Sequence, residues 1–153
     1  MQGTAMLQIA EFIAVLACAM FTGAAVYITF VEHPARMQCG TAIAATEFAP
    51  SYRRATVIQA TCAAGGLLSS VAAWVSGASF SWLVAGVLLG SVIPFTLVVI
   101  LPTNKRLLDP TLDKRSAETE RLLARWSRLH GVRSVISSVA LLLFLYLAIL
   151  KPQ

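Results

Sequence analysis

The sequence predicts an all-α fold, a four-helix transmembrane bundle with an amphipathic cytoplasmic extension before the fourth helix. Hydrophobic residues make up 58% of the 153 residues and charged residues only 12%, about half the charged share of a typical soluble domain. Four apolar stretches are each close to the roughly 20 residues that a helix needs to cross a bilayer, and only Glu11 and Arg133 are charged within them. The stretches are residues 5–30, 56–75, 82–101 and 132–150.

The composition also restricts the domain organisation and the class of protein. Helices of a soluble domain need polar faces, which these stretches lack, so we expect one integral membrane domain over residues 1–153. The formal net charge of +5 comes without a nucleic-acid-binding motif, so the expected partner is the lipid bilayer and not nucleic acid. The first stretch is too long for a cleaved signal peptide and no Lys or Arg precedes it, so we expect it to remain as helix one.

Helices two and three contain residues that predict their starts, kinks and contacts. A short helix over 41–48 is predicted in the first gap, with Pro50 helping to open helix two. In helix three, Pro94 cannot donate a backbone hydrogen bond to the carbonyl of Gly90 and should kink the helix. Gly86 and Gly90 allow close approach of a neighbour, either another helix of the same chain or a second copy in a homo-oligomer.

The segment 114–131, before helix four, is amphipathic. Ser116 followed by Glu118 and Glu120 is typical of a helix start, because acidic residues are favoured at the positive end of the helix dipole. Apolar residues then recur at helical spacing beside arginines, which predicts a helix that lies on the membrane surface or extends helix four into the cytoplasm. These apolar residues are Leu122, Leu123, Trp126 and Leu129.

The basic residues predict the orientation in the membrane. All but one of the 12 Lys and Arg residues lie in or beside the first and third gaps, which face one side of a four-helix bundle. The positive-inside rule assigns that side to the cytoplasm and hence both termini to the other side. The composition, rich in Ala, Arg and Leu, favours a bacterial protein of the inner membrane. The eleven residues are Arg36, Arg53, Arg54, Lys105, Arg106, Lys114, Arg115, Arg121, Arg125, Arg128 and Arg133.

One stripe of helix four combines residue types that can carry chemistry. Trp126, His130, Arg133 and Ser137 all lie within about 80° of Leu122 on a helical wheel, so the stripe should face protein. An arginine on a packed membrane face needs a partner or an anionic ligand. The simpler interpretation is that Trp126 belongs to an interfacial aromatic belt and that Arg133 extends to lipid headgroups. The coincidence of all four on one arc favours a functional pocket.

Other helix ends should bring polar residues to the same depth. Glu32 and His33 follow the last apolar residues of helix one, and Glu32 is the predicted counter-ion of Arg133. Asn104 comes just after helix three, and Tyr52 and Gln59 lie near the start of helix two. The sequence therefore predicts one polar site at the cytoplasmic end of the bundle.

The two histidines, His33 and His130, could instead hold haem or a metal ion within a helical bundle. The sequence has no Glu-x-x-His, His-x-x-x-His or Cys-x-x-Cys-His pattern, so we expect no cofactor and keep haem and metal as alternatives. Glu11 lies near the opposite end of helix one, where a carboxyl group could relay protons or could simply lie at the membrane interface.

Three motifs in this order resemble one family. They are residues 32–36 (Glu-His-Pro-Ala-Arg), residues 102–107 (Pro-Thr-Asn-Lys-Arg-Leu) and residues 126–133, which contain Trp-x-x-x-His-x-x-Arg. Together they are similar to the anthrone oxygenase-like family of small four-helix membrane proteins, long catalogued as a domain of unknown function. The resemblance spans essentially the whole chain. Fungal members oxidise polyketide anthrones to anthraquinones with molecular oxygen and without a conventional cofactor, whereas many bacterial members have no assigned activity. The resemblance therefore implies a related oxygenation and does not transfer the substrate.

The resemblance implies roles for the residues of the predicted site. His130 or His33 would remove the acidic proton of an apolar, aromatic anthrone as general base. Arg133 and Asn104 would stabilise the resulting anion, which reacts with dioxygen. Trp126 would stack on the planar substrate, and further residues would complete the binding site. These further residues are Tyr52 and Gln59.

Two other functions compete with oxygenation. Small multidrug exporters also have four short helices and a membrane glutamate, here Glu11, that exchanges protons for a cationic drug. The long, charged third gap counts against this alternative, because such exporters have minimal loops. A haem- or quinone-associated membrane subunit is the third hypothesis.

Overall fold

The four apolar stretches form four long helical segments. A computed structural model describes residues 2–149 of the chain. All regular structure within that range is helical, which confirms the predicted all-α fold. Four segments are long and apolar enough to cross a membrane, so the protein is an integral membrane protein. These segments are Thr4–Gln38, Thr41–Val75, Phe80–Leu107 and Ala117–Ile149.

The first segment continues past residue 30, where the apolar stretch ends. It consists of α1 (Gln2–Tyr27), the π-helical turn η1 (Ile28–Glu32) and α2 (His33–Gln38). In η1 the backbone N–H of His33 donates to the carbonyl of Ile28, one residue further back than in an α-helix. The residues expected just after the helix, including Glu32 and His33, are therefore helical themselves.

The second segment is a single helix, α3 (Thr41–Val75), which follows a tight turn at Gly40. Gly40 has a φ of 93°, which glycine adopts without the steric cost of a Cβ atom. Residues 41–48 are helical as predicted, but Pro50 does not open a new helix and lies inside α3. Buried apolar side chains before Pro50, such as Phe48, pack into the bundle and hold this part of the helix in place.

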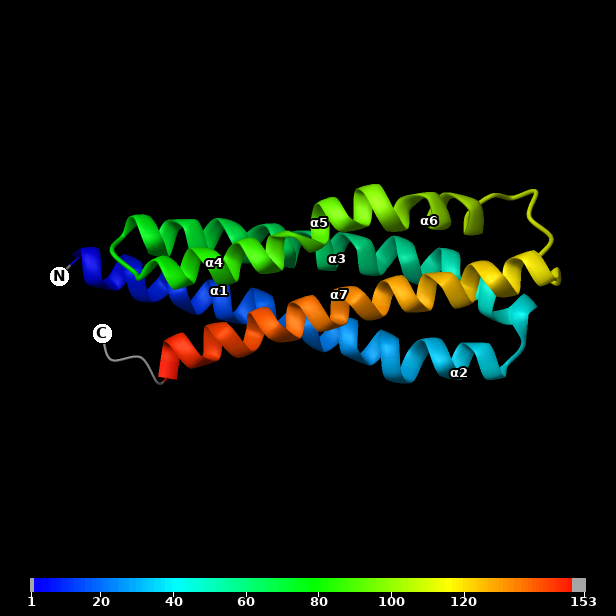
Figure 1. The fold of residues 1–153 in the computed structure, drawn as a ribbon, viewed down its shortest axis with the longest axis horizontal. Helices are drawn as coiled ribbons and strands as arrows, with labels where there is room; N and C mark the ends of the chain where they lie inside the picture. Colours follow the sequence, from blue (N-terminus) through cyan, green and yellow to red (C-terminus); the bar gives the residue numbers. More distant parts are fainter. Residues whose placement is uncertain (1, 150–153) are drawn as a thin grey trace.

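The third segment is interrupted near the predicted proline kink. Helix α4 ends at Gly90, and helical structure resumes at Val92 on a different line, so that α5 and α6 are offset from α4 (Figure 1). Pro94 has no N–H group for the carbonyl of Gly90, which is the physical reason for the interruption. The parts are α4 (Phe80–Gly90), α5 (Val92–Phe95), the π-helical turn η2 (Thr96–Ile100) and α6 (Leu101–Leu107).

The fourth segment joins the amphipathic stretch and helix four in one helix, α7 (Ala117–Ile149). The hydroxyl oxygen of Ser116 caps it by accepting a hydrogen bond of 3.2 Å from the backbone N–H of Thr119. In the loop before it, the side chain and backbone N–H of Thr111 both donate to Asp109 and lower the pKa of that carboxyl group. The amphipathic stretch therefore extends helix four, as one of the two predicted arrangements requires.

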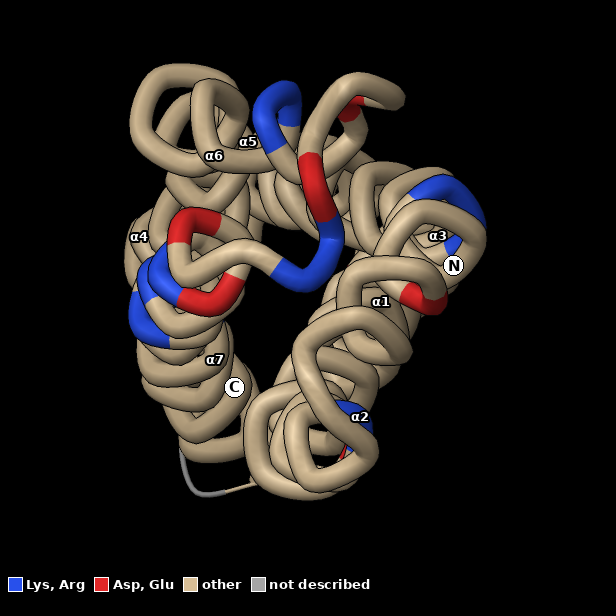
Figure 2. Tube along the Cα trace, turned by 90° about the vertical axis from the view of Figure 1, so that its right-hand side faces the viewer, with Lys and Arg blue, Asp and Glu red and all other residues tan. Residues whose placement is uncertain are grey.

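The helical segments lie side by side, with the start of α1 and the end of α7 at one end of the molecule (Figure 1). The α2–α3 turn and the loop before α7 lie at the other end, where charged residues gather (Figure 2). The buried apolar side chains form two clusters along this axis. We call the part of the bundle around the first cluster the packed half. We call the part around the second cluster the polar half, because buried polar residues lie beside it. The packed half contains Ala14, Cys18, Phe21, Ala25, Ala63, Trp82, Ala85, Leu89, Val92, Ala140, Phe144 and Leu147. The polar half contains Ile28, Ala44, Ala45, Phe48, Ile100, Leu107, Leu112, Leu123 and Trp126.

Small residues bring α3 and α4 into direct contact in the packed half. A Cβ atom added to Gly86 would lie 2.5 Å from the hydroxyl oxygen of Ser70, and one added to Gly90 would lie 2.8 Å from Leu67 Cδ2. The predicted glycine face thus packs within the same chain. Association into a homo-oligomer stays a prediction.

Candidate functional site

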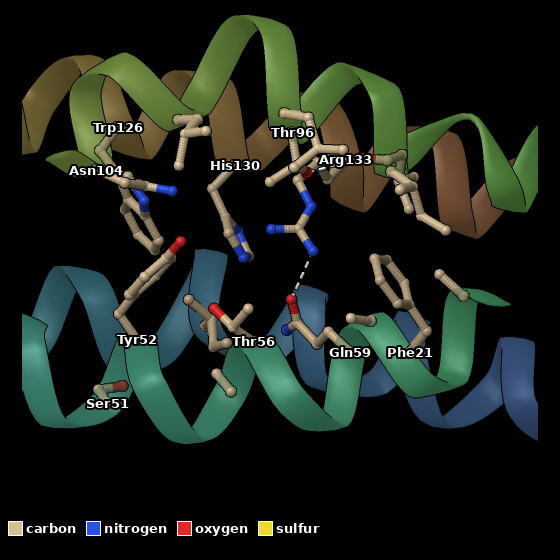
Figure 3. A pocket seen from close by; sticks show the side chains of 18 of the residues that line it. Phe21, Ser51, Tyr52, Thr56, Gln59, Thr96, Asn104, Trp126, His130 and Arg133 are labelled. Atoms are coloured by element: carbon tan, nitrogen blue, oxygen red, sulfur yellow. Dashed lines mark hydrogen bonds between the residues drawn. The ribbon is translucent and has the colours of Figure 1, made fainter.

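A cavity of about 140 Å³ extends from the polar half to the border of the packed half, among the first segment, α3, α7 and the α5–α6 part of the third segment (Figure 3). An enclosed apolar cavity of about 150 Å³ holds one benzene molecule, so this cavity has room for about one aromatic ring of a ligand. Six residues predicted as site residues line it, from three of the four segments. They are Tyr52, Gln59, Asn104, Trp126, His130 and Arg133.

Helix α7 provides the most polar wall of the cavity. Trp126, His130 and Arg133 follow one another at spacings of four and three residues, so they lie above one another on one face. Trp126 is 6% and His130 is 2% exposed. The inward stripe predicted from the sequence is therefore present, and it faces protein and not lipid.

The His130 ring is held from behind by two hydroxyl groups. His130 Nδ1 lies 3.1 Å from Thr29 Oγ1, which in turn lies 2.8 Å from Ser134 Oγ. Ser134 Oγ also lies 3.0 Å from the backbone carbonyl of Ala25 in α1. For His130 Nε2, the part of the chain that the structure describes offers no hydrogen-bond partner. Thr29 and Ser134 were not among the predicted site residues.

Trp126 is the centre of an aromatic cluster beside the cavity. Its ring is stacked on His130 with centroids 4.7 Å apart, and the edge of Phe48 meets it at 5.3 Å. The ring of His33 also lies 5.3 Å from Trp126, and the Arg36 guanidinium lies over it at 5.9 Å. His33 is buried but does not line the cavity, so the structure brings only one of the two predicted bases to the site.

Arg133 is bound by an amide and not by a carboxylate. Its Nη2 donates to Gln59 Oε1 over 2.7 Å (Figure 3), and its guanidinium carbon lies 5.3 Å from the centroid of Phe21. The predicted ion pair between Glu32 and Arg133 is wrong, since none is formed between these two described residues. The charge of Arg133 in the cavity wall is therefore not neutralised by Glu32.

Glu32 belongs to a second polar cluster, which ties the first segment to α3. It forms an ion pair with Arg36, one turn later in the same helical segment, and accepts a hydrogen bond of 2.8 Å from Ser51. Arg36 also pairs with Glu47 at 2.9 Å. Because Arg36 is only one turn away, it is a far easier partner for Glu32 than an arginine on α7.

Several polar atoms at the cavity are buried without a partner. Both side-chain polar atoms of Asn104, together with Gln59 Nε2 and Arg133 Nε, lack a hydrogen bond to the described residues. A buried donor or acceptor without a partner costs about 1–3 kcal/mol. In Figure 3 Asn104 lies beside Trp126, whereas Arg133 and Gln59 face each other next to His130, so unpaired polar groups lie in the cavity wall on both sides of this histidine.

Both π-helical turns contribute to the cavity wall. Ile28 in η1 and Thr96 in η2 both line it, and a proline follows each turn at the start of the next α-helix. Each segment is helical before and after its turn, so the proline leaves a carbonyl of the preceding turn without its usual N–H partner. Such turns are frequent at functional sites, and this feature could not be recognised from apolar periodicity.

The cavity opens sideways between α3 and η2. Thr56 and Ala60 on α3 and Leu97 on η2 line it and are themselves exposed. All three lie within segments long and apolar enough to cross a membrane. The opening is therefore on the flank of the bundle, between two membrane-spanning segments.

Comparison with known proteins identifies the family. The model of the anthrone oxygenase family matches residues 48–143, more than half of the chain. The chain belongs to the anthrone oxygenase family. It is similar to anthrone oxygenase tpcL of Aspergillus fumigatus, with 36% identity over 78 residues, which are 49% of this chain and 48% of that protein. The match thus spans about half the length of this relative. No solved structure matches the chain.

The anthrone oxygenase match includes all six predicted residues that line the cavity. The resemblance inferred from the three motifs is confirmed. Three residues of the first segment contact His130 or Trp126 and precede the matched range. They are Thr29, His33 and Arg36. The range matched by the family model therefore covers the cavity wall formed by α3, the third segment and α7.

The alternative functions depend on other residues. Glu11 does not line the cavity and lies ten residues before Phe21 in α1, about 15 Å along the helix axis. Within residues 2–149, no three His, Cys, Asp or Glu side chains cluster closely enough to hold one metal ion. Function without a cofactor stays a prediction.

Proposed function

We propose that this protein oxygenates a planar, phenolic substrate of the anthrone type with molecular oxygen, with His130 as general base and without a resident cofactor. One observation carries the proposal: an imidazole with a free nitrogen shares a cavity with an aromatic wall and with an arginine bound only by an amide. Removal of an acidic carbon-bound proton needs these three features, namely a base, a flat binding surface and a fixed positive charge.

His130 is the base in this proposal. The carbon–hydrogen bond between the two aromatic rings of an anthrone is acidic, because the anion delocalises onto the ring carbonyl. His130 lines the cavity and its Nδ1 is bound to Thr29, so Nε2 is the nitrogen that receives the proton. A positioned base of this kind contributes about 10²–10⁴-fold to a reaction rate.

The anion would be stabilised by Arg133 and Asn104. Gln59 holds the Arg133 guanidinium in place through Nη2, while Arg133 Nε stays without a partner. Asn104 is 1% exposed and offers a free N–H donor at the cavity. Donors fixed in advance in a dry site stabilise developing negative charge without reorganisation.

The aromatic cluster would orient the ring system. Trp126 and Tyr52 give the cavity an aromatic surface; the Trp126 ring itself stacks on His130, and Tyr52 lies stacked against Phe48 with centroids 5.7 Å apart. Stacking contributes about 0.5–1.5 kcal/mol beyond area burial. A planar ligand on this surface would hold its reactive carbon near the imidazole.

The oxygen step balances without a further reductant. The carbanion transfers electrons to dioxygen and forms a carbon–oxygen bond, which gives a hydroperoxide after protonation. Loss of water from the hydroperoxide breaks the oxygen–oxygen bond and leaves a carbonyl group. One methylene group and one dioxygen thus become one carbonyl group and one water molecule, and one oxygen atom enters the product.

The sideways opening supports entry from the bilayer. Thr56, Ala60 and Leu97 border it, and both the apolar substrate and dioxygen dissolve in hydrocarbon. By the positive-inside rule, the charged end next to the cavity faces the cytoplasm and both termini lie on the other side. In a bacterial cell this places the site near the inner face of the inner membrane.

The test is oxygen-dependent conversion of an anthrone by membranes from cells that express the protein. Anthrones also oxidise spontaneously, so the rate is compared with that of membranes without the protein. We expect quinone formation with one labelled oxygen atom per quinone from ¹⁸O₂, and a fall of about 10²–10⁴-fold in the enzymatic rate for His130→Phe. Glu11→Gln is the matched control and should keep its activity.

Three outcomes would contradict the proposal. Unchanged turnover by His130→Phe at equal expression would remove His130 as the base. If His33→Asn lost as much activity as His130→Phe, the residues that line the cavity would not identify the base. Drug resistance that is lost in Glu11→Gln would favour export instead.

A further inference from the structure

The hydroxyl groups behind His130 form a chain that ends on a backbone carbonyl. From the ring outward, the chain runs from His130 Nδ1 to Thr29 Oγ1 over 3.1 Å and to Ser134 Oγ over 2.8 Å. It ends at the carbonyl oxygen of Ala25 over 3.0 Å. The chain joins η1, α7 and α1. A carbonyl oxygen can only accept hydrogen bonds, so it fixes the direction of the chain.

The direction follows from counting protons. Each hydroxyl group has one proton to donate. Ser134 donates to the carbonyl of Ala25, so Thr29 must donate to Ser134. Thr29 Oγ1 can then only accept from the ring, which requires a proton on Nδ1 of His130.

The opposite direction leaves oxygen atoms facing each other. If Ser134 donated to Thr29, and Thr29 to His130 Nδ1, no proton would lie between Ser134 Oγ and the carbonyl of Ala25. The carbonyl of His130 lies 3.4 Å from the same oxygen on another side. Ser134 Oγ would then face two carbonyl oxygens with lone pairs alone, which is unfavourable in a buried site.

We propose that Thr29 and Ser134 are positioning residues that lock neutral His130 in the tautomer protonated at Nδ1. The lone pair of Nε2 then points at the ligand and not at the protein. The catalytic meaning rests on the proposed function, whereas the tautomer itself is a property of the protein without substrate. In a neutral imidazole, the hydrogen bond made by one nitrogen decides the state of the other.

The lock explains why hydroxyl groups, and not a carboxylate, lie behind this base. A carboxylate would also hold a proton on Nδ1, but it would favour the charged imidazolium. Two neutral hydroxyls select the tautomer while the ring stays a neutral proton acceptor beside Arg133. The arrangement fits a base that must accept a proton in an already positive cavity.

The test is ¹⁵N NMR of histidine-labelled protein in lipid nanodiscs, at a pH at which the ring is neutral. The chain contains only two histidines, so His33→Asn assigns the ring signals of His130. We expect a protonated Nδ1 and an unprotonated Nε2 in the parent protein. Thr29→Val should move the ring toward the other tautomer, and Thr29→Ser should restore the parent spectrum.

Thr22→Val is the matched control, because Thr22 is buried in α1 two turns before Thr29 and its hydroxyl forms a hydrogen bond with Cys18 and not with His130 or Ser134. It should leave the spectrum unchanged. In the anthrone assay we expect Thr29→Val to lose about 10- to 100-fold in rate, as seen when outer partners of metal-binding histidines are removed, and Thr29→Ser to keep it.

The two proposals fail in different ways. A proton on Nε2 of His130 in the parent protein, or an unchanged tautomer in Thr29→Val, would overturn the lock whatever the activity. The expected spectra without any oxygenation would support the lock and contradict only the proposed function.

Discussion

The packed half and the polar half use the same helical segments in opposite ways. In the packed half, glycines bring α3 and α4 so close that a Cβ on Gly86 would collide with Ser70. In the polar half, the third segment is offset after Gly90 and a cavity lies between it and α3. Tight contact at one end of the bundle therefore accompanies an open, polar space at the other.

The two halves also differ in how they treat buried polar groups. In the packed half, the Ser70 hydroxyl donates to the carbonyl of Gly66 over 2.7 Å and is satisfied. In the polar half, Asn104 has no partner at all among the described residues, and Arg133 has one amide. Unpaired groups destabilise a fold, so we infer that the packed half stabilises the bundle and the polar half carries its function.

Loss of one tryptophan from each half should give the largest contrast. Trp82 is 4% exposed and packs against Phe144 in the packed half, and Trp82→Ala should cost about 3–5 kcal/mol of unfolding free energy. Trp126→Ala should cost less, because Trp126 already borders a cavity, but it should lose activity. Unfolding in mixed detergent micelles measures the first effect, and equal losses of stability would refute the division.

Arg133→Met should separate function from stability within the polar half. We expect a fall of about 10²–10³-fold in turnover, as for the loss of a donor to a developing anion. Stability should be unchanged or higher, because a similar apolar residue removes a half-buried charge. Arg128→Met, on the exposed side of α7, is the control. A strong loss of stability in Arg133→Met would mean that Arg133 is structural.

Among these substitutions, Gly86→Ala should have the smallest effect, and it should change stability without changing activity. The added methyl group meets Ser70 in α3, and overpacking of this kind costs about 1–3 kcal/mol. Gly65→Ala in α3 meets nothing within 4 Å and should be neutral or slightly stabilising. Thermal unfolding of the two variants in the same detergent measures the difference. A neutral Gly86→Ala would show that the α3–α4 contact is not critical.

The sequence was sufficient for features that depend on local pattern. The four segments follow from apolar length, and the inward face of α7 follows from the 3.6-residue period that places Trp126, His130 and Arg133 together. The start of α7 at Ser116 follows from capping chemistry. These predictions required no knowledge of how one helix lies against another.

Features that depend on contacts between helices were missed. Thr29 contacts His130 because η1 and the middle of α7 lie at the same height along the bundle. No local sequence pattern reveals this alignment. The extra residue of η1 also turns every later side chain by about 100° relative to a continuous α-helix. His33 follows this turn and lies beside Trp126, outside the cavity. The predicted ion pair between Glu32 and Arg133 was wrong for a simpler reason, because Glu32 pairs with Arg36 on its own segment.

The continuity of α7 limits how this protein can change its length. One uninterrupted helix connects His130 in the polar half to Phe144 in the packed half. A single inserted or deleted residue between them would rotate one half by about 100° against the other, so the imidazole or the phenyl ring would swing into the acyl chains. Length changes should therefore be confined to the loop before α7 and to the turns at the bundle ends.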